Sequence, residues 1–416
     1  MEIAVIACAL AACTSGPATL QPAGPGWPMF RGDLARDGHP PGATLDARGA
    51  RRLGLAWRVK LDGAVDGTPA VAGGAVVVGS FGGTLAAIDA GTGSTLWTKR
   101  GLGAIADSPA IDGKRVYAGT LTGHVFAFDL SSGHQVWDWT APPDAAVWAS
   151  PVAYRDLVIV GVASPYGDTP LVAGRLYGLN ATTGLIRWTA CVEDGCAPGG
   201  GVWSTPAIDS TGTAFVGIGN PSDGVLAFDP MTGGRKWLSA LYADQSRDLD
   251  VGASPVVLTL NGKEAVAQAT VEGMFAVLDA ATGSVLWSSE LVAGTAVHGL
   301  IASPAYDGTS IYVGSASPPT GILALQPSDG AVVWRHGTDQ PVYSAPAAGK
   351  DVIVFGTGAV FGELGSGSVI ALSSADGQVL WSYDAHSAVR SGAAVSGDLV
   401  VIGDYRGEVL AFRPKP

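Results

Sequence analysis

The chain has 416 residues, of which 47% are hydrophobic and 14% are charged, and 36 acidic against 24 basic side chains give it a formal net charge of −12. Nucleic acids and anionic membranes both bind clustered lysine and arginine. We therefore exclude a nucleic-acid partner and expect contact with a membrane only through a lipid anchor. The one local concentration of cations, Arg48, Arg51 and Arg52, is expected to be solvated at the start of the first strand.

The N-terminal segment resembles an export signal. Residues 3–10 are apolar, and Leu10-Ala11-Ala12-Cys13 is similar to the processing box of bacterial lipoproteins, with Cys13 as the lipidated residue. The basic side chains that usually precede such an apolar segment are missing. We interpret residues 1–13 as a leader and residues 14–26, which are rich in proline, glycine and alanine, as a flexible tether. The expected location is extracytoplasmic, as an anchored lipoprotein or as a periplasmic or secreted protein.

Residues 53–416 form a repeat of near-constant length. Eight tryptophans are separated by 40, 40, 51, 49, 50, 47 and 47 residues, which is the length of one four-stranded propeller blade. Small-residue and proline steps such as Ser108-Pro109-Ala110 keep the same register, and apolar, strand-length segments follow each step. The fold is therefore predicted to be all-β, with eight four-stranded antiparallel blades and one packing tryptophan in each. These tryptophans are Trp57, Trp97, Trp137, Trp188, Trp237, Trp287, Trp334 and Trp381.

Turns led by aspartate or asparagine, such as Asp89-Ala-Gly-Thr-Gly93, or by weaker variants precede seven of these tryptophans, but none precedes Trp57. Glycine supplies the positive φ of the turn and the leading side chain bonds local backbone groups, so we interpret these residues as structural. The last repeat ends with the strand 408–412, which no tryptophan follows. We predict that the strand 53–60 pairs with 408–412 and completes the eighth blade, so that closure hides the edges.

Four cysteines divide into two groups. Cys8 and Cys13 belong to the leader, whereas Cys191 and Cys196 form a local pair within the sequence CVEDGC. A disulfide is the expected state of this pair outside the cytoplasm. A metal site is the weaker alternative, because neither a second cysteine pair nor a closely spaced histidine pair accompanies it.

The tryptophan and Asp-x-x-Thr-Gly repeat resembles the blades of the pyrroloquinoline quinone (PQQ) propeller family over residues 27–412. Residues 27–33 (WPMFRGD) are similar to the strap that precedes the first blade in that family, and we expect the strap, 27–52, to act as an apolar plug against the ring. Two branches matter: quinoprotein alcohol dehydrogenases, including polyvinyl-alcohol-dehydrogenase-like proteins, and non-catalytic BamB-like lipoprotein propellers. They share a fold and differ at the site.

The resemblance to the dehydrogenases implies roles for individual residues. Residues 199–206 (GGGVWSTP) are similar to the stretch with the stacking tryptophan, which implies that Trp203 forms the floor under PQQ. Residues 217–221 (GIGNP) resemble the stretch whose asparagine binds calcium, which implies that Asn220 is a ligand. Residues 248–255 (DLDVGASP) resemble the segment of the catalytic aspartate, which implies Asp250, or less favourably Asp248, as the base that takes the alcohol proton.

Departures from the dehydrogenase pattern weaken this assignment. Asp168 stands near the expected position of a ligand glutamate, but Pro165 and Pro170 alter its loop, so it is a poor second metal ligand. The cofactor-facing lysine of the family is absent from residues 267–273 (AQATVEG). Each retained residue also has a structural alternative: blade packing for Trp203, a turn for Asn220 and a solvated rim charge for Asp250. A glycosidase pair of Asp248 and Asp250 is disfavoured, because two solvated charges on the rim are commoner than a catalytic pair of carboxylates.

The function that we expect from the sequence is a scaffold. A monomeric propeller without a cofactor would bind a protein partner of the cell envelope through the loops on one rim of the ring. The longest loops lie between Trp148 and Pro255, which we assign to the fourth to sixth blades, so the interaction surface is expected there. The alternative is a PQQ- and calcium-dependent alcohol dehydrogenase that passes electrons to a separate acceptor.

Overall fold

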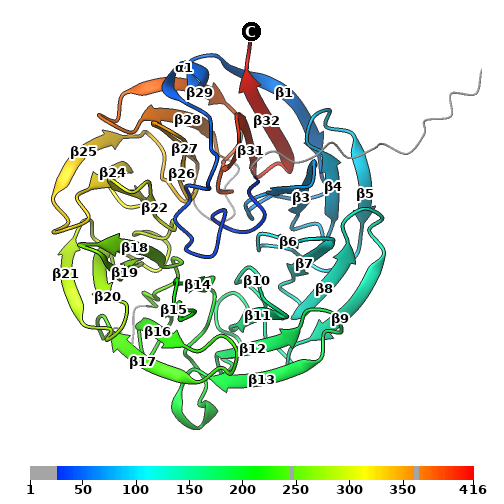
Figure 1. Ribbon diagram of the computed structural model, residues 1–416, viewed down its shortest axis with the longest axis vertical. Coiled ribbons are helices and arrows are strands. Elements are labelled where there is room, and N and C mark those ends of the chain that lie inside the picture. Colours follow the sequence, from blue (N-terminus) through cyan, green and yellow to red (C-terminus); the bar gives the residue numbers. More distant parts are fainter. Residues whose placement is uncertain (1–25, 244–247, 360–364) are drawn as a thin grey trace, which may run out of the picture.

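The computed structural model describes residues 26–243, 248–359 and 365–416. The predicted leader, its Cys13 and residues 14–25 of the predicted tether lie outside the described residues. Eight four-stranded antiparallel sheets are arranged as blades around a central axis (Figure 1). The prediction of an eight-bladed all-β propeller is confirmed. Within the described ranges, no helix is long and apolar enough to cross a membrane.

Seven blades follow the chain from the axis to the outer rim of the ring (Figure 1). Their strands are β2 (Ala70–Ala72), β3 (Ala75–Gly79), β4 (Leu85–Asp89) and β5 (Thr95–Lys99); β6 (Ala110–Asp112), β7 (Arg115–Gly119), β8 (His124–Asp129) and β9 (Gln135–Thr140); β10 (Val152–Tyr154), β11 (Leu157–Val162), β12 (Arg175–Asn180) and β13 (Ile186–Cys191); β14 (Ala207–Ile208), β15 (Ala214–Ile218), β16 (Gly224–Phe228) and β17 (Arg235–Ala240); β18 (Val256–Leu260), β19 (Lys263–Ala269), β20 (Met274–Asp279) and β21 (Val285–Glu290); β22 (Ala305–Tyr306), β23 (Ile311–Ser315), β24 (Gly321–Leu325) and β25 (Val332–Gly337); β26 (Ala347–Ala348), β27 (Val352–Gly356), β28 (Ser368–Ser373) and β29 (Val379–Asp384).

The eighth blade joins both ends of the propeller. It consists of β30 (Ala394–Ser396), β31 (Leu399–Gly403), β32 (Glu408–Pro414) and, on the outside, β1 (Leu53–Lys60). Strand β1 runs antiparallel to β32, with Lys60 opposite Glu408 and Leu53 opposite Pro414. The predicted closure is therefore confirmed. Because β1 completes the last blade, residues 148–255 belong to the third and fourth blades and the start of the fifth, not to the fourth to sixth as expected.

The repeated tryptophans dock on the turn of the following blade. Trp97 Nε1 donates to the carbonyl oxygen of Leu130 at 2.7 Å, and Gly133 of the same turn has a φ of 67°. A Cβ added to Gly133 would lie 2.8 Å from Cδ2 of Trp97, so the turn needs glycine for its backbone angle and for this close approach. The same hydrogen bond and contact recur at Trp57, Trp137, Trp188, Trp237, Trp287 and Trp334.

Trp381 is the exception, and ring closure explains it. The eighth blade has no turn between β32 and β1, because these strands belong to the two ends of the chain. The indole of Trp381 packs edge-on against Phe412, with 5.0 Å between ring centroids, and its Nε1 has no hydrogen-bond partner among the described residues. Of the eight repeated tryptophans, Trp57, Trp97 and Trp137 are buried, whereas the other five are partly exposed.

The small-residue and proline segments at the start of the innermost strands, such as Ser108-Pro109-Ala110, connect neighbouring blades near the axis. The backbone N–H of one step donates to the hydroxyl of the next, as from Ser108 to Ser150 at 3.0 Å. This bond links the first six blades in succession, through Thr68, Ser108, Ser150, Thr205, Ser254 and Ser303. The series stops at the seventh blade, where Ala345 has no hydroxyl group.

The strap crosses the centre of the ring at one end of the ring axis (Figure 1). Carbonyl oxygens between Trp27 and Gly38 accept hydrogen bonds from innermost strands of six blades, at Val71, Ile111, Ile208, Val257, Tyr306 and Ala348. The strap then reaches the eighth blade, where Thr44 N and Leu45 N donate to Gly397 O. The short helix α1 (Ala47–Ala50) follows and leads into β1.

The strap differs from the expected apolar plug. Trp27 is fully buried, but so are Arg31 and Arg36. Arg31 Nη2 donates to Pro304 O at 2.7 Å and Arg36 Nε donates to Pro206 O at 2.9 Å. The two guanidinium groups thus satisfy proline carbonyls that precede the innermost strands of the fourth and sixth blades.

Candidate functional site

The residues implied by the dehydrogenase resemblance lie at the end of the ring axis opposite the strap. Trp203 lies in the connection from β13 to β14, Asn220 in the turn between β15 and β16, and Asp250 in the connection from β17 to β18. The connections that hold Trp203 and Asp250 lead into the beginning of innermost strands, and the turn of Asn220 lies at the same end of the ring. The strap bonds the innermost strands at their other end, close to the turns that follow them. We call the two ends the site end and the strap end.

The three predicted residues meet at Asp250. Trp203 Nε1 donates to Asp250 Oδ2 at 2.7 Å, and the backbone N–H of Asn220 donates to Asp250 Oδ1 at 3.0 Å. Two glycines that the sequence analysis did not single out make room for this contact: a Cβ on Gly219 would lie 2.4 Å from Asp250 Oδ1, and one on Gly252 would lie 1.7 Å from Cζ2 of Trp203. Both glycines stand in the quoted motifs GIGNP and DLDVGASP, which is the signal that identifies them.

The surroundings of Asp250 raise its pKa above the usual value. Burial raises the pKa of Asp250, the hydrogen bonds from Asn220 and Trp203 lower it, and the negative charges of Asp248 and Asp168 raise it again. Asp168 therefore acts on Asp250 through its charge, although its own side chain is exposed on the loop between β11 and β12. Asp248 is exposed as well and has a φ of 54°.

The donor set does not fit a calcium ion with a quinone. Calcium takes about six to eight oxygen ligands, but both oxygens of Asp250 are already held by N–H donors. In the part of the chain that the structure describes, no three His, Cys, Asp or Glu residues are placed to bind a metal ion. Gln268 lies in the stretch where the family has a lysine, and its Nε2 donates to two backbone carbonyls. No reaction step can therefore be derived through the cofactor.

An arginine occupies the other side of the site end. The guanidinium of Arg390 lies 5.4 Å from the ring centroid of Tyr343 and 5.0 Å from that of Tyr405. Its Nη2 is 3.5 Å from Asp66 Oδ2, and the side chain is only 5% exposed. The sequence analysis missed this group. The sequence feature that could have predicted it is the position of Arg390 directly before Ser391. The other repeats have a small residue or Asp107 at this position.

Asp107 is a second buried residue that the sequence analysis missed. Its Oδ2 accepts a hydrogen bond from Gly119 N at 2.6 Å, in the position where Ser204 and Ser344 use a hydroxyl group. Burial raises the pKa of Asp107 well above its usual value. Because its Oδ2 holds the backbone of Gly119, the carboxyl group has a structural role.

Two loops at the site end are braced against each other, and we call residues 165–174 and 192–200 the stapled rim. The predicted disulfide joins Cys191 to Cys196, with 5.1 Å between the Cα atoms. Gly174 N donates to Gly199 O and Gly199 N donates to Val172 O, at 2.8 and 2.9 Å. Gly200 N donates to Asn220 O, which connects the rim to the Asp250 cluster.

Comparison with known sequences finds two polyvinylalcohol dehydrogenases. Polyvinylalcohol dehydrogenase from Sphingopyxis sp. (strain 113P3) is 27% identical, over 39% of this chain and 33% of that protein. The corresponding enzyme from Pseudomonas sp. is 26% identical, over 39% and 33%. The match thus spans about a third of the length of these relatives.

Solved structures share the fold at low sequence identity. Quinohemoprotein alcohol dehydrogenase from Comamonas testosteroni has a TM-score of 0.79 and 18% identity, covering 94% of this chain and 80% of the other. BamB from Moraxella catarrhalis has a TM-score of 0.67 and 18% identity, covering 87% and 99%. A family model described as "Outer membrane protein assembly factor BamB" matches residues 45–252, 138–315 and 271–416. The chain therefore belongs to this family of PQQ-like β-propellers.

Proposed function

We propose that the protein is an exported, lipid-tethered propeller that binds a protein partner of the cell envelope through the stapled rim. The observation that carries the proposal is the exposure of two large apolar side chains there: Tyr166 is 69% and Leu171 is 51% exposed. Tyrosine is enriched at protein interfaces, and exposed apolar groups on a braced loop are typical of binding sites. The disulfide and the lipoprotein-like segment ending at Cys13 support export.

The charge of the stapled rim indicates what the partner carries. Asp168 lies on one loop, and Glu193 and Asp194 lie on the other. The Asp194 side chain is 100% exposed and forms only a peripheral ion pair with Arg235, at 3.3 Å. Complementary charge speeds association and selects partners. We therefore expect a partner surface that combines apolar and basic side chains.

The Asp250 cluster supports a scaffold because it ties loops together. Asp250 accepts one hydrogen bond from each of two neighbouring connections, and Asn220 O holds Gly200 of the stapled rim. A carboxylate used in this way stabilises the arrangement of three loops. The same residues that resemble a catalytic set can therefore serve as the support of a binding surface.

The test is crosslinked capture from membranes with the full-length tagged protein. The variant Tyr166→Asp with Leu171→Asp is expected to lose an envelope protein that the wild type captures. The matched control is Leu185→Asp with Ile186→Asp, two residues that are 68% and 50% exposed at the strap end, and it should capture the same protein as the wild type. Equal capture by all three proteins, or capture by none, would contradict the proposal.

The second candidate is a PQQ- and calcium-dependent alcohol dehydrogenase, and the convergence of Trp203, Asn220 and Asp250 favours it. Purified protein mixed with PQQ and Ca²⁺ is tested for cofactor retention in gel filtration and for dye-linked alcohol oxidation. Retention with turnover that Asp250→Asn abolishes would replace the scaffold proposal. Absence of binding at micromolar PQQ would exclude the enzyme.

A further inference from the structure

The strap end carries cations that the sequence separates widely. Arg48, Arg51 and Arg52 lie in and after α1, and the pairing of β1 with β32 brings Lys415 beside them. Lys415 N donates to Arg52 O at 2.8 Å, and Arg52 Nη1 donates to Lys415 O at 2.9 Å. We call these four residues the basic corner. All four are exposed.

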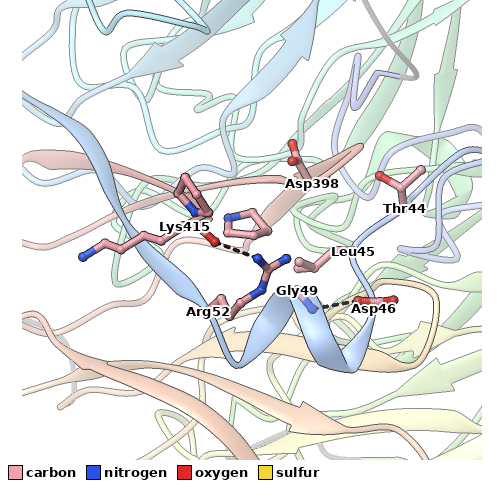
Figure 2. A pocket seen from close by; sticks show the side chains of 9 residues that line it. Thr44, Leu45, Asp46, Gly49, Arg52, Asp398 and Lys415 are labelled. Carbon is pink, nitrogen blue, oxygen red and sulfur yellow. Dashed lines mark hydrogen bonds between the residues drawn. The ribbon is translucent and has the colours of Figure 1, made fainter.

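A surface pocket opens at the basic corner. It has a volume of about 420 Å³, and Figure 2 shows the guanidinium of Arg52 reaching toward Lys415, with Asp398 and Thr44 nearby. Asp398 pairs with Arg413 at 2.8 Å, and Asp46 caps α1 by accepting from Gly49 N at 2.7 Å. The acidic side chains are thus used within the fold.

Among the described residues, no carboxylate lies within 4.0 Å of a cationic nitrogen of Arg48, Arg51, Arg52 or Lys415. This local excess contrasts with the acidic stapled rim at the site end and with the net charge of −12 for the whole chain.

The strap begins at the same end of the ring as the basic corner. Trp27 pairs with Val71 in the innermost strand of the first blade, next to the eighth blade that carries the basic corner. The predicted tether, 14–26, has 13 residues, and a flexible chain of that length has a root-mean-square span of about 20 Å. An anchor at Cys13 would hold the strap end close to a bilayer and raise the effective concentration of lipid headgroups there.

We infer that the basic corner binds the phosphate headgroups of an anionic lipid bilayer, so that the strap end faces the membrane and the stapled rim faces away from it. The inference rests on the proposed membrane tether. It gives the ring a fixed orientation, since a flexible tether alone leaves the ring free to rotate. It also explains how the stapled rim stays accessible to an envelope partner.

The test uses the full chain with Cys13→Ser, so that no lipid anchor contributes, and vesicles of phosphatidylcholine with or without the anionic lipid phosphatidylglycerol. Sedimentation measures binding. We expect binding only to the anionic vesicles and its loss at high salt. Replacing the basic corner by glutamine should weaken binding about fivefold per cation, which corresponds to about 1 kcal/mol for each.

The matched control replaces four other cations by glutamine. These are Lys99, Arg100 and Arg406 at the site end and Arg335 in the outermost strand β25. This control should bind like the parent, and thermal unfolding should show that both variants are folded. Binding that survives loss of the basic corner, equal losses in both variants, or binding of inorganic phosphate without binding of vesicles would each overturn the inference. No envelope protein is present, so this result is independent of the capture experiment.

Discussion

Two glycines of the fifth blade separate two reasons for which a position requires glycine. Gly262 and Gly283 have nearly equal φ angles, 78° and 74°. A Cβ on Gly262 would meet nothing within 4 Å, whereas one on Gly283 would lie 2.7 Å from Cε3 of Trp237. A side chain at either position therefore meets the same cost of a positive φ. At Gly283 it also clashes with the indole of Trp237 in the gap between blades.

Alanine at the two positions measures these costs. Gly262→Ala should lower the free energy of unfolding by about 1 kcal/mol, the cost of the left-handed conformation. Gly283→Ala should lower it by about 2 kcal/mol more, because the indole of Trp237 must move in a packed gap. Urea denaturation of both variants checks this. Equal destabilisation would show that the contact with tryptophan has no energetic weight.

The hydrogen bond between Trp203 and Asp250 should appear in a titration. A bond to the charged form of a carboxyl group lowers its pKa, so Trp203→Phe should raise the pKa of Asp250 further. The carboxyl carbon signal in NMR, assigned by its loss in Asp250→Asn, reports the change. Trp148→Phe is the control, because Trp148 Nε1 donates to Ser164 O, at 2.9 Å, and not to Asp250. A larger shift in the control would contradict this assignment.

At the scale of single elements, the strap carries buried charged side chains, among them Arg31 and Arg36. Burial, with the charge of Asp33, raises the pKa of Asp37 to about 7, whereas the bond from His39 N and the charge of Arg31 lower it. The charge of Arg36 lowers the pKa of Asp33, and Asp33 in turn acts on Asp37 through its own charge. The folded protein therefore keeps a proton on Asp37 that the unfolded chain loses near pH 4.

The strap should consequently weaken as the pH rises. Stability linked to Asp37 is fully present below about pH 4 and is lost up to about pH 7. Between pH 5 and 8 this group should lower the free energy of unfolding by about 2 kcal/mol, and Asp37→Asn should remove that part of the pH dependence. Urea denaturation at both pH values tests it.

The control for the strap is a carboxylate with the opposite shift. Hydrogen bonds from Thr282 lower the pKa of Asp279, so its contribution is lost only as the pH falls below its usual range. Asp279→Asn should leave the difference between pH 5 and 8 unchanged. If Asp37→Asn also leaves it unchanged, Asp37 is not the titrating group.

At the scale of the whole molecule, stability depends on closure. Strand β32 lies between β31 and β1, and β1 has no other partner in the described sheets. A chain that ends at Gly407 lacks β32, so it loses the centre of the eighth blade and exposes two strand edges. It should fail to form a folded monomer in circular dichroism and gel filtration. A chain that ends at Pro414 keeps β32 and should fold, and a folded monomer from the shorter chain would refute this.

Local rules explain why so much of the architecture could be predicted. The spacing of the tryptophans, the seven turns and the unpaired last strand define the blades, their number and the closure, because each turn depends on the few residues within it. The pair Cys191 and Cys196 is likewise local. The dehydrogenase resemblance named Trp203, Asn220 and Asp250, but it did not predict that both oxygens of Asp250 are occupied.

The sequence by itself determined the repeat, the ring and its closure, since periodic turn chemistry and strand patterning act over short distances. Only the tertiary structure decided which distant side chains meet: Arg31 with Pro304, Arg390 with Asp66, and Arg52 with Lys415. Closing the ring brings together residues that lie 273, 324 and 363 positions apart. No local pattern records such contacts, because they depend on the summed geometry of all eight blades.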